Sequence, residues 1–129
     1  RAFEALPTDG CVVRSSYRHW VDGAEVVAGW EETSPWYDLG TLEAYWQANV
    51  RLAQGGMPWA GVPELSSGFI GAGVSLGEGA RVIASVVGEG SSIGRGVSVE
   101  RSVIWPGTVV GESTVDALVG PWGTIPMGR

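Results

Sequence analysis

The strongest constraint on the fold is the spacing of aliphatic residues in the second half of the chain. They recur at intervals of six residues, interrupted by single intervals of five. The positions are Ile70, Leu76, Val82, Val87, Ile93, Val99, Ile104 and Val110. Small or slim residues stand two places earlier: Gly68, Val74, Ala80, Ser85, Ser91, Val97, Ser102 and Thr108. Glycine usually follows the aliphatic. Because two intervals of six and one of five make up each unit, the sequence aligns on itself with a period of 17 residues.

This pattern is typical of hexapeptide repeats that wind into a parallel β-helix. Each face of a triangular coil supplies one aliphatic side chain to the interior, and the sharp corners between faces favour glycine and other small residues. The 21 glycines of the chain lack collagen spacing, so they indicate either disorder or such a turning repeat. We predict a β-helix of about 3.5 coils over residues 67–129, with all eight aliphatics inside. An antiparallel β domain with many turns is the alternative.

Residues 1–55 have a mixed α/β pattern. A first helix is predicted from a cap at Asp9, with apolar residues at helical spacing and Gly23 at its end. Those apolar residues are Val12, Val13, Tyr17, Trp20 and Val21. Residues 24–30 are predicted to form a short strand.

A second helix is predicted to begin at the Gly40–Thr41 turn and to end at Gly55–Gly56. Its apolar stripe comprises Leu42, Tyr45, Trp46, Asn49, Leu52 and Ala53. Residues 56–66 contain two prolines and several small residues, which indicates a linker.

Composition excludes several classes of function. The net charge of −6 argues against nucleic acid and against anionic membranes as partners. The chain has no lysine, which excludes Schiff-base chemistry and a lysine-containing phosphate loop. Cys11 is the single cysteine, which fits a reducing, cytoplasmic location. Because the first residue is Arg rather than Met, we expect the chain to be part of a longer protein.

The turn before the second helix is the main candidate for chemistry. Asp38 precedes Gly40 and the helix N-terminus at Thr41, where backbone N–H groups and the helix dipole favour anions. A carboxylate at this point can hold a divalent metal beside phosphates, or it can simply cap the turn. His19, the single histidine, is expected to be a surface or half-buried helix residue.

The sequence WYDLGT at residues 36–41, with Tyr45 and Ala48–Asn49, resembles the W-x-D-[IVL]-G-T…Y…A-N motif of sugar-1-phosphate nucleotidylyltransferases. The guanylyltransferase and thymidylyltransferase branches are the most similar in style, and a hexapeptide β-helix after the motif matches the guanylyltransferase order of domains. The resemblance implies a left-handed coil. It also implies that Asp38 is catalytic and helps to hold Mg²⁺, while Trp36 and Gly40 shape the adjoining sugar-phosphate pocket.

The implied partners of the complete enzyme are a nucleoside triphosphate and a sugar-1-phosphate. The Gly-rich loop and the phosphate-binding lysines of the family are absent from these 129 residues, so we expect this chain alone to be inactive. The alternative is a non-catalytic β-helix module for oligomerisation or regulation. An acyltransferase would need a histidine from another chain, because the repeats contain none.

Outward-facing apolar residues in the repeats predict self-association. Where glycine is the rule after an interior aliphatic, the chain has Ile83 and Trp105, and the residues before interior aliphatics include Val86, Val103 and Val109. Exposed apolar strips usually mark contact surfaces, so these five residues are the predicted homo-oligomer interface. The alternative is that the first region or the C-terminal tail folds over the strip. The tail, with Leu118, Val119, Pro121 and Trp122, could instead cap the open last coil.

Overall fold

A computed structural model describes residues 11, 13–23, 27–34, 36–55 and 68–128. The chain forms two compact units, residues 1–35 and 36–129. The second helix therefore shares a unit with the repeats, whereas the sequence grouped it with the residues before it. The predicted linker at residues 56–66 lies outside the described residues.

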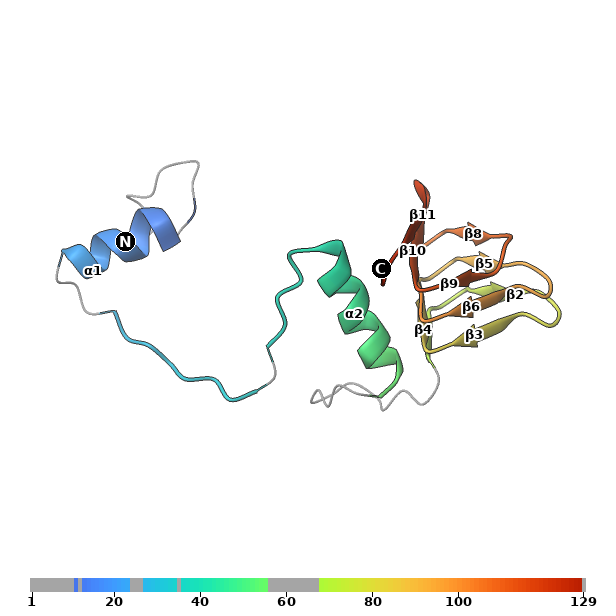
Figure 1. Cartoon of the computed structure of the whole chain (residues 1–129), viewed down its shortest axis with the longest axis horizontal. Helices are drawn as coiled ribbons and strands as arrows, with labels where there is room; N and C mark the ends of the chain where they lie inside the picture. Colours follow the sequence, from blue (N-terminus) through green and yellow to red (C-terminus); the bar gives the residue numbers. More distant parts are fainter. Residues whose placement is uncertain (1–10, 12, 24–26, 35, 56–67, 129) are drawn as a thin grey trace. The chain divides into compact units, whose positions relative to one another are not determined.

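The first unit contains a single helical segment in its described part. A π-helical turn, η1 (Val13–Tyr17), continues into α1 (Arg18–Asp22), which ends at Gly23 as predicted (Figure 1). The predicted cap Asp9 and the predicted apolar position Val12 lie outside the described residues. His19 is exposed on α1, in agreement with the surface position expected for it.

The strand predicted for residues 24–30 is wrong where it can be examined. Residues 27–30 are extended without sheet pairing, and residues 24–26 lie outside the described part. A strand needs a sheet partner to satisfy its backbone groups. The described residues of 1–55 contain no strand, so the α/β character predicted for this region is not confirmed.

The second unit contains a parallel β-helix whose three faces are three sheets (Figure 1). The first coil comprises β1 (Gly68–Ile70), β2 (Ser75–Leu76) and β3 (Arg81–Ile83), and the second β4 (Ser85–Val87), β5 (Ser92–Ile93) and β6 (Ser98–Glu100). The third coil comprises β7 (Val103–Ile104), β8 (Val109–Val110) and β9 (Thr114–Val115). Each strand pairs in parallel with the strand one coil further on, which confirms the predicted β-helix.

The period of 17 residues holds for two coils and then shortens. Val86 pairs with Val103, 17 residues later, but Val103 pairs with Leu118, only 15 residues later. The two residues are lost at the corner between β8 and β9, where only Gly111-Glu112-Ser113 connects the strands. The chain then adds a fourth strand to one face, β10 (Ala117–Gly120), and folds back as the antiparallel strand β11 (Gly123–Pro126).

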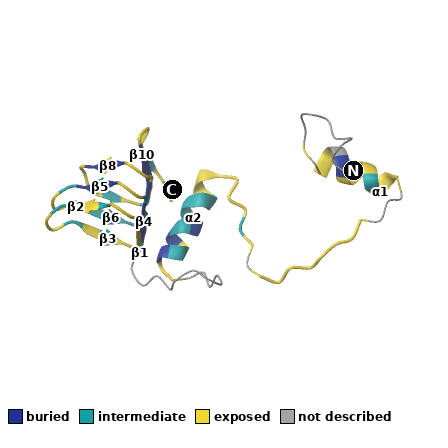
Figure 2. Cartoon of the chain, turned by 180° about the vertical axis from the view of Figure 1, so that it is seen from behind, coloured by how far each residue is buried: buried dark blue, intermediate teal, exposed yellow. Residues whose placement is uncertain are grey.

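The interior contains the predicted aliphatic column, most tightly packed in the second and third coils. Val87, Ile93, Val99, Ile104 and Val110 are buried together with Ala117 and Val119 (Figure 2). Ile70 and Leu76 lie directly below Val87 and Ile93 in register, yet they remain 48% and 46% exposed. They occupy the first coil, which has a second coil on one side only, so they share the column without the burial of the later coils.

Buried serines fasten successive coils at the positions two residues before the aliphatics. The Ser85 hydroxyl donates to the carbonyl of Ile83 at 2.7 Å and accepts the N–H of Ser102 at 3.0 Å. Ser102 makes the same two contacts one coil later. Its hydroxyl donates to the backbone carbonyl of Glu100 and accepts the N–H of Ala117. At the serine corners, a small hydroxyl therefore satisfies backbone groups of neighbouring coils.

The structure explains why glycine usually follows an interior aliphatic residue. A Cβ on Gly77 would lie 2.5 Å from the backbone nitrogen of Arg95 in the next coil, closer than any side chain tolerates. The left-handed φ values belong instead to glycines two residues further on, such as Gly73 and Gly90 with φ of 67°. One set of glycines permits close stacking and the other permits the turn.

Candidate functional site

The Asp38 turn forms the start of α2 (Leu42–Ala53). The Asp38 carboxylate accepts the N–H of Gly40 through Oδ1 at 2.9 Å, and the Thr41 hydroxyl accepts the N–H of Ala44 at 3.1 Å. Thr41 has the extended backbone of a helix cap, with φ −127° and ψ 156°. The two side chains thus close a turn and a helix N-terminus in succession, as the residue order predicted.

Trp36, Asp38 and Gly40 are all exposed at this turn. Glycine is favoured at position 40 because a Cβ there would lie 3.0 Å from Asp38 Oδ1. Within the described ranges, no three His, Cys, Asp or Glu side chains gather closely enough to hold a metal ion. Mg²⁺ in phosphate-handling sites is commonly held by one or two carboxylates together with substrate phosphates. The single exposed carboxylate of Asp38 is compatible with such a shared site.

Helix α2 packs along the face of the β-helix that contains β1, β4 and β7 (Figure 1). Its buried residues are Ala48, Val50 and Ala53, two of them alanines that allow a close approach. On the coil, Val103 faces outward from β7 and is nevertheless only 2% exposed. The helix and the outer face of the sheet therefore bury each other's apolar residues.

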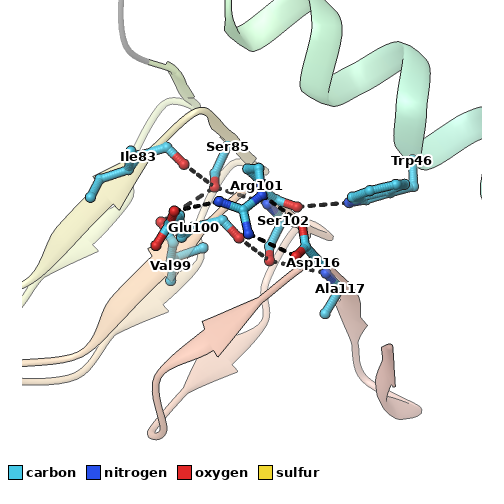
Figure 3. Close-up of polar contacts among 9 residues, drawn as sticks. All are labelled: Trp46, Ile83, Ser85, Val99, Glu100, Arg101, Ser102, Asp116 and Ala117. Atoms are coloured by element: carbon cyan, nitrogen blue, oxygen red, sulfur yellow. Dashed lines mark hydrogen bonds and ion pairs between the residues drawn. The ribbon is translucent and has the colours of Figure 1, made fainter. Parts of the chain in front are cut away.

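A hydrogen bond fixes the position of α2 along this face. Trp46 donates its indole N–H to the backbone carbonyl of Arg101 at 2.7 Å (Figure 3). Arg101 lies at the corner between β6 and β7, with a left-handed φ of 43°. Ala84 and Asp116, at the same corner of the neighbouring coils, have φ of 48° and 49°. Non-glycine residues pay roughly 1–2 kcal/mol each for this conformation, so this corner differs from the glycine corners.

Side-chain contacts stabilise the strained corner. Arg101 forms a two-pronged ion pair with Asp116, in which Nε and Nη2 each lie 2.7 Å from a carboxylate oxygen (Figure 3). Glu100 also contacts the guanidinium. The hydrogen bond from Arg101 holds the pKa of Asp116 below its ordinary value, and the same contact raises the pKa of Arg101. We call Trp46, Glu100, Arg101 and Asp116 the corner clamp.

The five residues of the predicted interface do not form one exposed strip. Val103 is buried and Val86 is half-buried beside α2, as in the alternative in which another part of the chain covers them. Ile83, Trp105 and Val109 remain exposed. The tail also takes part, since β10 and β11 extend the same sheet. A charged substitution at Val103 would therefore disturb the packing of α2 rather than report on association.

Aromatic rings gather where α2 begins and the third coil turns. Trp105 and Trp122 lie edge to face with ring centroids 4.6 Å apart, and Tyr45 lies 6.5 Å from Trp105. Both tryptophans keep about half of their surface exposed. This arrangement rigidifies the junction of α2, β7 and the β10–β11 turn.

Sequence reasoning missed the corner clamp. The available signal was the absence of glycine at positions 84, 101 and 116, which occupy one corner column once the shortened third coil is recognised.

None of the helices in the described residues has the length and apolar character that crossing a membrane requires. Comparisons with protein-family models, with curated proteins and with solved structures found no match to this chain.

Proposed function

We propose that this chain is the C-terminal portion of a cytoplasmic sugar-1-phosphate nucleotidylyltransferase, and that its β-helix serves assembly or regulation. The observation that supports the proposal is the continuity between motif and coil. Residues 36–41 form a turn that leads directly into α2, and α2 is bound to the β-helix through Trp46 and Arg101. The motif residues and the repeats thus belong to one compact unit.

In the complete enzyme, a nucleoside triphosphate and a sugar-1-phosphate would meet beside this turn. Asp38 would provide one carboxylate to a Mg²⁺ ion, and Trp36 and Gly40 would border the sugar phosphate. Bound Mg²⁺ stabilises the negative charge that develops on the phosphates during transfer. The reaction proposed is attack by a sugar-phosphate oxygen on the α-phosphorus, which releases pyrophosphate. The phosphate-binding loop and lysines would come from residues outside these 129.

The test of this role for Asp38 is the substitution Asp38→Asn in the gene product that contains these residues. An asparagine keeps an oxygen that can accept the Gly40 N–H, so the turn survives while the negative charge is lost. We expect turnover to fall at least 100-fold, and the Mg²⁺ concentration needed for half-maximal rate to rise. Glu43→Gln, an exposed neutralisation in the first turn of α2, is the matched control and should retain activity. Unchanged turnover in Asp38→Asn would remove Asp38 from the metal site.

A second candidate function is a non-catalytic β-helix module for oligomerisation or regulation. It is favoured by the Asp38 carboxylate accepting the Gly40 N–H, because a turn-capping aspartate needs no further role. The two candidates differ in one measurable respect. A module would show no nucleotidyl transfer even within its complete gene product, whereas the enzyme would.

A further inference from the structure

The C-terminal end of the β-helix has an open strand edge. In the described part of the chain, β8 pairs only with β5, and β9 pairs only with β6. The carbonyls of Thr108 and Val110 accept the N–H groups of Ser92 and Gly94 from the coil below, each at 2.9 Å. Because backbone groups alternate along a strand, the N–H and C=O of Val109 face the open edge. The remaining face, which contains β1, β4, β7 and β10, differs because β11 continues its sheet beyond β10.

Two apolar residues stand at this end where the lower coils have serine or glycine. On the face made by β2, β5 and β8, the outward column reads Ser75, Ser92 and then Val109. Val109 is 78% exposed. At the corner before this face, the two lower coils have Gly71 and Gly88, and the third coil has Trp105 at the equivalent position. Two of the three residues of the predicted interface that remain exposed, Trp105 and Val109, thus lie in the third coil beside the open edge, whereas Ile83 lies in the first coil.

The open edge carries little of the charge that protects many edge strands. Natural edges carry lysines, prolines or inward-pointing charges that prevent pairing with another strand. Residues 108–115 include one charge, Glu112, which is exposed beside a shallow depression bordered by Val110, Val119 and Thr124. Such an edge can accept an added strand, with backbone hydrogen bonds giving most of the affinity.

We propose that β8 pairs with β8 of a second copy of this chain, antiparallel and around a two-fold axis at Val109. This geometry matches Val109 with Val109 and Thr108 with Val110, so apolar groups meet across the axis. Glu112 would lie opposite Pro106 rather than opposite its own symmetry mate, so like charges are not brought together. An isologous contact of this kind uses the same patch on both copies and closes the assembly at two. The proposal rests on the assembly role proposed above and gives it a surface.

The first test is sedimentation of the whole chain. We expect a dimer for the wild type, and Val109→Ser should raise its dissociation constant on the order of 100-fold, because two valines lose their burial. Serine is the residue that the same column has in both lower coils, so the coil should fold unchanged. Ile83→Ser is the matched control: it removes an exposed aliphatic at the opposite end of the coil, and it should leave the dimer intact.

The second test is disulfide formation across the axis. Residues that exchange backbone hydrogen bonds in an antiparallel pair have Cα atoms about 5.5 Å apart, which suits a disulfide. In a Cys11→Ser background, Val109→Cys should form crosslinked dimers on mild oxidation, and Ile83→Cys should not. A wild type that sediments as a monomer overturns both this surface and the assembly role. A dimer that Val109→Ser leaves unchanged, or that Val109→Cys does not crosslink, overturns the β8 pairing and leaves the assembly role standing.

Discussion

The indole N–H of Trp46 lies 2.7 Å from the backbone carbonyl of Arg101, a residue 55 positions later in the chain. This bond joins the helix that follows the Asp38 turn to the strained corner of the β-helix. The corner itself is fixed by the ion pair between Arg101 and Asp116. Through these contacts, the position of the motif relative to the coil depends on a few identifiable groups.

Trp46→Phe should destabilise the unit by about 1 kcal/mol. The substitution keeps an aromatic ring against the coil but removes the donor, which leaves the Arg101 carbonyl without its partner. Urea unfolding followed by circular dichroism measures the loss. Trp36→Phe, at an exposed tryptophan, serves as the control and should unfold at the wild-type urea concentration. Equal midpoints for both variants would show that the Trp46 bond contributes nothing.

Replacing Ile93 with alanine should cost about 2–5 kcal/mol, because a buried side chain leaves a cavity. Leu76 occupies the same column one coil below, but it is half exposed. Leu76→Ala should therefore cost clearly less. Comparable losses at the two positions would mean that the first coil is closed in solution, contrary to the structure.

Residues with a left-handed φ predict substitutions of opposite sign at alanine and at glycine. Ala84→Gly should stabilise the unit by roughly 0.5 kcal/mol, since glycine relieves a φ of 48° but adds freedom to the unfolded chain. Gly90→Ala should destabilise it by about 1 kcal/mol: its φ is 67°, and an added Cβ would meet no atom within 4 Å. Denaturant midpoints at unchanged m-values measure both effects. Stabilisation by Gly90→Ala would contradict the conformational explanation.

The ion pair predicts a specific loss of stability in acid. Arg101 lowers the pKa of Asp116 in the folded state, so the stabilisation is complete above the ordinary aspartate pKa of about 3.9. It disappears as the pH falls through the lower folded value. The charged group that contacts Asp116 is Arg101, and Glu100 contacts the same guanidinium. Between pH 6 and roughly pH 3, wild type should therefore lose more stability than Asp116→Asn. Parallel pH profiles would exclude a stabilising role for the pair.

Much of the coil could be predicted from sequence because its determinants are local and repeat. One aliphatic per face, such as Ile93, and a small residue before it, such as Ser91, are visible in any single coil. The helix start at Thr41 was equally visible, since a cap depends on neighbours within four residues.

The contacts between distant residues could not be read in this way. Nothing around Trp46 indicates that its partner is the carbonyl of Arg101, and nothing around Val103 indicates that α2 covers it. The pairing of Arg101 with Asp116 was hidden for another reason: the third coil is two residues shorter, so a fixed period of 17 places the wrong residues together.

Release of pyrophosphate tests the proposed function most directly. The gene product that contains these 129 residues would be incubated with Mg²⁺, each nucleoside triphosphate and a series of sugar-1-phosphates, beside the 129-residue chain alone. The account predicts Mg²⁺-dependent pyrophosphate release with at least one pair of substrates by the complete product, and none by the chain alone. Release by the chain alone, or none by the complete product with any pair, would contradict it.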